Sequence, residues 1–226
     1  MLSSSRWDGP SGPPTITDAL PLRTYNLVIG AILLYGFAIN AFMVKFCAHY
    51  FENINYLVLL IGYFVLCFLG IRISLRSDSP GISFLGYNMV VVPVGVILSL
   101  GLEAVESAQI IHAAALTAIV TLSMMAMAAV WPEFFLGLGR VLFFALLIVI
   151  IAEICTALMG IYMPRAWDVG VAIIFCGYIG FDWAKAQQTD HTLDNAVDAC
   201  VGLYLDIINL FLRILSSSSR SSSRRK

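Results

Sequence analysis

Charged residues are scarce in this sequence. Only 12% of its 226 residues are Asp, Glu, Lys or Arg, while 60% are hydrophobic. A soluble domain averages about 25% charged residues, so this composition excludes an ordinary soluble domain and is typical of a polytopic membrane protein. The formal net charge of −1 gives no reason to expect nucleic acid as a partner.

Motifs for chemistry are also scarce. The sequence has no Gly-x-Ser-x-Gly, no His-Glu-x-x-His, no phosphate-binding loop and no spacing of His with Cys or Ser that suggests a triad. Its five cysteines are single, odd in number and without a Cys-x-x-Cys pair, so neither a disulfide framework nor a thiolate metal site is indicated. We therefore expect no enzyme activity and no resident cofactor.

Long apolar runs make up most of the chain. A membrane-spanning helix needs about 20 apolar residues, and seven runs meet this rule: 24–46, 54–75, 82–101, 108–130, 135–159, 166–186 and 194–215. The connections are too short to hold a soluble domain. The sequence thus predicts an all-α membrane protein, with residues 23–215 forming one seven-transmembrane-helix bundle.

Polar segments flank this bundle on both sides. Residues 1–22 are rich in Ser, Gly and Pro and lack the apolar core of a cleavable signal, so we expect a disordered tail. Residues 216–226 form a basic Ser/Arg-rich tail, which we expect to be solvated or attracted to anionic headgroups. An integral, multi-pass protein of a bacterial inner membrane or an endoplasmic reticulum fits these features equally.

Basic residues near the span ends give no decisive orientation. Six lie on one face of the membrane and three on the other, besides four in the C-terminal tail: Arg6, Arg23, Arg72, Arg76, Arg140 and Lys185 against Lys45, Arg165 and Arg213. If the tail is left out, the excess of Lys and Arg places the N-terminus in the cytoplasm. If the four basic residues of the tail are counted, the opposite face has seven basic residues against six. A re-entrant last segment would instead place both termini in the cytoplasm.

The last apolar run carries an acid at its centre, Asp206. An ionised Asp at that depth costs roughly 2.5–3.5 kcal/mol on insertion scales, so such residues mark functional sites by default. At about 100° per residue, six residues fall within a sector of about 80°. We call this set the polar seam: Asn195, Asp198, Gly202, Asp206, Asn209 and Arg213. The seam must face protein, water or an ion, so we expect this helix to be central.

The same run resembles a known family. Leu203-Tyr-Leu-Asp-Ile-Ile-Asn-Leu-Phe-Leu, preceded by Gly180-Phe-Asp182 on the previous span, is similar to the signature of the Bax-inhibitor (transmembrane Bax-inhibitor motif) family. The separation of Asp182 and Asp206 by 24 residues matches the family's pair of aspartates. The resemblance covers about the last forty residues in detail and the rest by hydropathy and span number.

Three further residues are candidates. The resemblance implies that an Arg on the second span latches the aspartate pair, and we favour Arg72 over Arg76 because it lies deeper in the span. Glu153 lies deep in the fifth span, outside any family motif that we can assign. Desolvation would keep such an acid protonated unless it is paired, and both alternatives stay open.

The aspartate pair defines the predicted chemistry. If Asp182 and Asp206 meet in a low-dielectric site, they cannot both stay ionised, so they share a proton that joins the last two spans. Loss of this proton leaves two like charges that push the helices apart or recruit Ca²⁺, with Asp198 and Asn209 adding oxygen ligands. A mere hydrogen-bonded link between the helices is the alternative. The resemblance implies the gate, that is, a pH-sensitive calcium leak channel with Asp182 and Asp206 as transient calcium ligands.

Other functions use the same features. A regulatory membrane protein would bind a membrane protease or a cell-death partner, with the tails as contact points. A proton-coupled calcium exchanger would use the aspartates as a proton relay, although no inverted repeat is visible. An intramembrane aspartyl protease is disfavoured, because Ile179-Gly-Phe-Asp182 and Leu203-Tyr-Leu-Asp206 lack the Gly-x-Gly-Asp motif. The partners expected from sequence are therefore calcium, the lipid bilayer and one possible membrane protein.

Overall fold

A computed structural model describes residues 19–51 and 54–223. These residues form helices α1 (Leu22–Phe46), α2 (Ala48–Phe51), α3 (Tyr56–Ser74), α4 (Pro80–Gly101), α5 (Ser107–Val130), α6 (Pro132–Gly137), α7 (Gly139–Met159), α8 (Arg165–Gln188) and α9 (Leu193–Ser223). Seven of them, all but the short α2 and α6, are long and apolar enough to cross a membrane. The predicted all-α seven-span bundle is confirmed, and the predicted span ends lie within a few residues of helix ends except at the C-terminus, where α9 continues to Ser223.

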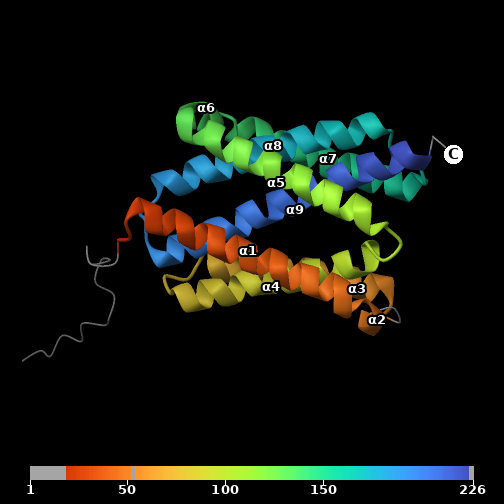
Figure 1. Ribbon diagram of the computed structural model, residues 1–226, viewed down its shortest axis with the longest axis horizontal. Helices are drawn as coiled ribbons and strands as arrows, with labels where there is room; N and C mark the ends of the chain where they lie inside the picture. The colour runs from red at the N-terminus through yellow and green to blue at the C-terminus, as the bar shows by residue number, and fades with distance from the viewer. Residues whose placement is uncertain (1–18, 52–53, 224–226) are drawn as a thin grey trace, which may run out of the picture.

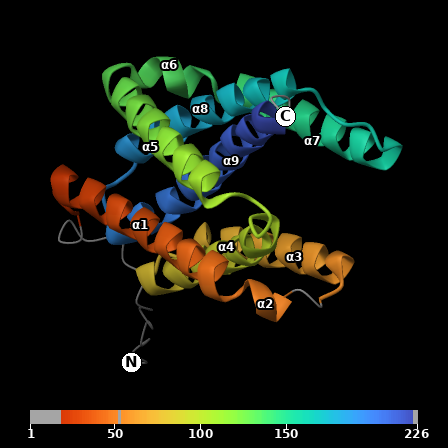
Figure 2. The same cartoon turned by 45° about the vertical axis from the view of Figure 1, so that its right-hand side comes forward.

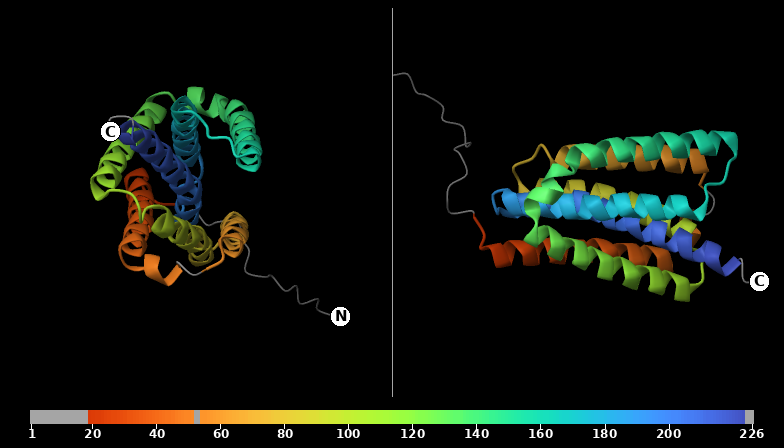
Figure 3. Two further views of the ribbon diagram at one scale, coloured as in Figure 1. Left: turned by 90° about the vertical axis from the view of Figure 1, so that its right-hand side faces the viewer. Right: turned by 90° about the horizontal axis from the view of Figure 1, so that it is seen from above.

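Helix α9 lies at the centre of the bundle (Figures 1 and 3). It packs against α8, α1, α4 and α5. Half of the residues in its most apolar stretch are buried, against 11% for α7, which lies at the periphery in Figure 2. The predicted central position of the last helix is thus confirmed, because the polar seam needs protein around it.

Local signals set the helix ends. The Asn55 side chain accepts a hydrogen bond from the Leu57 amide at 2.9 Å and caps α3. Pro80 occupies the first turn of α4, where a missing N–H costs nothing. Gly160 ends α7 with φ of +66°, the left-handed conformation that glycine adopts without a steric penalty.

Helices α3 and α4 form a closely packed hairpin. A Cβ atom placed on Gly70 would lie 2.5 Å from the Gly86 carbonyl oxygen, and one on Gly86 would lie 2.6 Å from the Gly70 carbonyl oxygen. Glycine at both positions lets the two backbones touch, as small residues commonly do between membrane helices.

The two segments expected as tails enter the helical region. Helix α1 begins at Leu22, and the Leu20 amide donates a 2.7 Å hydrogen bond to the His191 carbonyl. Residues 1–18 lie outside the described part of the chain. Helix α9 continues past Leu215 to Ser223 as one helix that runs from the end of the bundle where α1 begins to the opposite end (Figure 3). This course contradicts the re-entrant alternative for the last segment.

Candidate functional site: the acidic pair of α8 and α9

Helices α8 and α9 are antiparallel neighbours that bring the two expected aspartates together. The carboxyls of Asp182 of α8 and Asp206 of α9 lie close enough to interact directly. Asp206 is buried, with 8% of its surface exposed, and its Oδ2 atom has no donor among the described residues. A hydrogen bond between two carboxyls needs a proton on one of them. We call Asp182 and Asp206 the acidic pair.

Gly202 creates the space that the pair occupies. It lies one turn before Asp206 on α9, and a Cβ atom at this position would overlap Asp182 Oδ2. The contact also requires α8 to continue past Lys185, which it does, ending at Gln188. The missing side chain of Gly202 on α9 and the continuation of α8 to Gln188 therefore place the carboxyls together.

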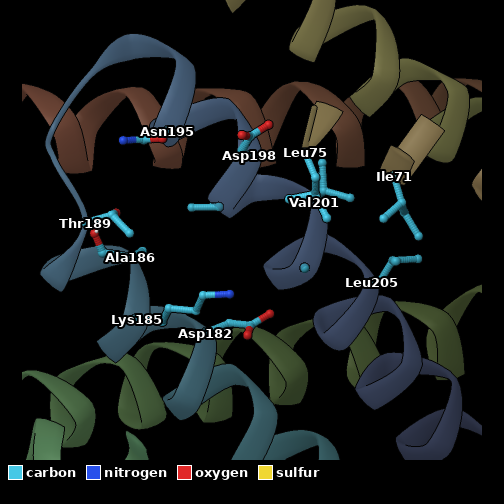
Figure 4. A pocket seen from close by; sticks show the side chains of 12 residues that line it. Ile71, Leu75, Asp182, Lys185, Ala186, Thr189, Asn195, Asp198, Val201 and Leu205 are labelled. Atoms are coloured by element: carbon cyan, nitrogen blue, oxygen red, sulfur yellow. Dashed lines mark hydrogen bonds between the residues drawn. The ribbon is translucent and has the colours of Figure 1, made fainter. Parts of the chain in front are cut away.

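A cavity of about 370 Å³ leads to the acidic pair. Asp182, Lys185, Asp198 and Gly202 line it together with apolar residues, and Figure 4 shows Asp182 and Lys185 side by side along one wall. The Lys185 ammonium interacts electrostatically with the Asp182 carboxyl. The cavity is thus amphoteric: its lining contains two acids, Asp182 of α8 and Asp198 of α9, and one base, Lys185 of α8.

Two serines connect the rim of this cavity to the α3–α4 hairpin. The Ser74 hydroxyl of α3 donates a short hydrogen bond to Asp198 Oδ1, and the Ser83 hydroxyl of α4 donates to Asp194 Oδ1 at 2.7 Å. Both serines are fully buried. The first turns of α9 are therefore fixed to the hairpin through acid–hydroxyl pairs.

The two arginines considered as latches lie away from the acidic pair. Arg72 and Arg76 are exposed, and the Arg72 guanidinium carbon lies 5.8 Å from the centre of the Phe68 ring. The side of α3 that faces the cavity carries Ile71 and Leu75 instead. In this structure the base beside the pair is Lys185, and the latch role of Arg72 stays a prediction.

The remaining seam residues continue along α9. Asn209 donates from Nδ2 to the Leu205 carbonyl at 2.8 Å, within its own helix. Arg213 is paired with Glu153, which settles the alternatives for that acid in favour of pairing. Within residues 19–51 and 54–223, no group of three or more His, Cys, Asp or Glu side chains is arranged to hold a metal ion. Two carboxylates alone suit a passing cation better than a resident one.

Sequence reasoning missed four residues that contact an acid of α9, the acidic pair or Arg213: Lys185, Ser74, Ser83 and Asp168. Lys185 and Asp168 lie near opposite ends of α8, where charged residues usually serve as interfacial anchors or complement the helix dipole. Only Asp168 carried a usable signal: like Asp182, it is an acid on the span that precedes α9.

Seven membrane-crossing helices around a central helix with a buried acidic pair define the class: a polytopic membrane protein with a titratable centre. The sequence profile of the family "Inhibitor of apoptosis-promoting Bax1" matches residues 18–223. The chain belongs to this Bax inhibitor family, as the aspartate motif indicated.

Similarity to individual relatives is partial. LIFEGUARD 3 of Arabidopsis thaliana is 42% identical over 81 residues, which is 35% of this chain and 32% of that protein. LIFEGUARD 4 of the same plant is 38% identical over 116 residues, 47% of this chain and 45% of that protein. An uncharacterized membrane protein of Vibrio cholerae is 32% identical over 108 residues, 47% of this chain and 48% of its own length. The matches thus span a third to a half of these relatives.

Proposed function

We propose that this protein is a pH-sensitive calcium leak channel gated by the acidic pair. The observation that supports it most is the placement of Asp182 and the buried Asp206 together at the end of an amphoteric cavity. Seven spans, a central polar helix and membership of the Bax inhibitor family agree with this function.

The gate follows from the electrostatics of the pair. With one proton between them, Asp182 and Asp206 form a hydrogen bond that joins α8 to α9 and closes the pathway below the cavity. When the proton leaves, two carboxylates repel one another in a low-dielectric site, and separation of the helices lowers the energy. The open pair then presents hard oxygen ligands to Ca²⁺, whose binding must be weak enough to let it leave. Flux therefore rises with pH.

Calcium flux into dye-loaded proteoliposomes tests the gate. For the wild type we expect flux to increase from about pH 6 to about pH 8, where the shared proton is lost. Asp206→Asn and Asp182→Asn replace the shared proton with a permanent amide donor, so each is expected to give low flux that no longer depends on pH. Asp190→Asn is the control, because this exposed acid lies in the turn outside the pair.

The outcomes separate the rival functions. Flux that requires an opposing proton gradient would identify an exchanger. No flux above empty liposomes from folded protein would refute the channel and favour a regulator of a membrane partner, the role that the family's name suggests.

A further inference from the structure

A second polar cluster lies at the opposite end of the α8–α9 interface. Arg213 of α9 places Nη2 2.6 Å from Glu153 Oε1 of α7, and Nη1 3.5 Å from Asp168 Oδ1 of α8. One guanidinium therefore connects three helices. The planar fork of arginine suits two carboxylates on different elements, which an ammonium could not engage in the same way.

Neighbouring donors hold the two acids in place. The Trp167 indole Nε1 donates to Glu153 Oε1 at 3.2 Å, and the Ser216 hydroxyl donates to Asp168 Oδ2 at 3.1 Å. Asp168 is 2% exposed, whereas the side chains of Arg213 and Glu153 are 22% and 35% exposed. The cluster thus has a buried side at α8 and a more exposed side at α7.

This cluster continues the line of acids along α9. At about 1.5 Å of rise per residue, Asp206 lies about 12 Å beyond Asp198, and Arg213 lies about 10 Å beyond Asp206. On the channel function proposed above, a cation that moves along α9 from the cavity past the acidic pair would meet Glu153 and Asp168 next. The Arg213 guanidinium lies between these carboxylates.

We propose that Arg213 is a second gate, in series with the acidic pair: a tethered cation that occupies the two carboxylates through which calcium leaves. The proposal rests on the channel function proposed above. The guanidinium repels an arriving cation and neutralises the oxygens that would bind it. When Arg213 moves away, Glu153 and Asp168 become an exit site of hard oxygen ligands. The two gates act independently, since one senses protons and the other is a permanent charge.

Arg213→Gln tests the second gate in the same liposome assay, at a pH near 8 where the acidic pair is open. Without the Arg213 charge, Glu153 and Asp168 are free to bind calcium and the second gate shifts toward its open state. We expect calcium flux about tenfold above wild type. The increase of flux with pH is expected to persist, because Asp182 and Asp206 are unchanged. Arg213→Lys keeps the charge but cannot engage both carboxylates with one fork, so its flux is expected to lie between those of wild type and Arg213→Gln.

Arg165→Gln is the matched control. Arg165 lies at the same end and donates from Nε to Ser217 Oγ at 3.0 Å, so its loss removes a positive charge without opening the carboxylates. Flux of Arg213→Gln at or below that of Arg165→Gln would overturn the proposal. So would a rise in flux that abolishes the pH dependence, because it would indicate a disrupted bundle rather than a separate gate.

Thiol labelling tests the gate even if the wild type conducts no calcium. Asn209→Cys is introduced into a background whose five native cysteines are replaced by alanine, and a cationic water-soluble thiol reagent is applied. We expect Arg213→Gln to accelerate labelling about tenfold relative to Arg165→Gln, and equal rates would contradict the proposal. If Arg213→Gln alone fails to fold, Glu153→Gln and Asp168→Asn are added, which removes the two negative charges that Arg213 neutralised; the acceleration relative to Arg165→Gln is still expected.

Discussion

Gly202 is the residue on which the acidic pair depends most directly, although it carries no functional group. Its missing Cβ leaves room for the Asp182 carboxyl against the α9 backbone. Any larger residue would move Asp182 or separate the helices, and both changes would break the contact between Asp182 and Asp206. The distance between Asp182 and Asp206 therefore depends on the absence of a Cβ atom at position 202.

Gly202→Ala is expected to destabilise the protein by about 1–3 kcal/mol, the usual cost of overpacking a filled site. Thermal unfolding of the purified protein in detergent measures this as a lower melting temperature. Gly170→Ala on α8 is the control: a Cβ there meets nothing within 4 Å, and alanine in a helix gains up to about 1 kcal/mol over glycine. Equal melting temperatures for the two variants would contradict the steric role of Gly202.

At the scale of elements, the α3–α4 hairpin is held to α9 by two hydroxyl–carboxylate bonds. Ser74→Ala removes the donor to Asp198. Hydrogen bonds to charged groups contribute about 1.5–3 kcal/mol, so we expect a clear loss of thermal stability. Ser123→Ala provides the comparison, because that exposed serine only donates to the Ile119 carbonyl of its own helix. If both variants unfold at the wild-type temperature, the bond contributes nothing to the attachment of the hairpin.

The elements also show how far sequence reasoning extends. The seven spans follow from apolar length alone, because a bilayer forces every backbone polar group into a helix. The seam on α9 follows from helical periodicity, and its Asp182 partner from the motif. The choice between Arg72 and Lys185 as the base beside the pair does not follow, because it depends on the rotation of α3. That helix is apolar on all sides, so its sequence does not indicate that Ile71 rather than Arg72 faces the cavity.

The contacts of Ser74, Ser83 and Glu153 also depend on how the helices pack, and the sequence does not indicate it. Ser74 and Ser83 carry no pattern that distinguishes them from other serines in spans, and their acidic partners lie more than a hundred residues away in the sequence. Glu153 and Arg213 were both visible as charges within apolar runs. Their pairing was not, since it requires α7 and α9 to meet beside the start of α8.

At the scale of the whole molecule, the α7–α8 and α8–α9 turns lie at opposite ends of the bundle (Figure 1). Because α8 is apolar and long enough to cross a membrane, these turns must lie on opposite sides of the bilayer. Tyr162→Cys and Asp190→Cys, each in a cysteine-free background, are thus expected to react with a membrane-impermeant thiol reagent from opposite sides. Labelling of both from one side of sealed, uniformly oriented vesicles would refute this arrangement.

The central position of α9 has a consequence for biosynthesis. The helix that fills the middle of the bundle follows the other six spans in the sequence, so the ribosome makes it after them. Until it arrives, the earlier helices lie in the bilayer without their common packing partner and with Asp182 lacking Asp206. A nascent chain that stops before residue 193 therefore lacks the central helix and one acid of the pair, so it cannot leak ions by the route proposed for the finished protein.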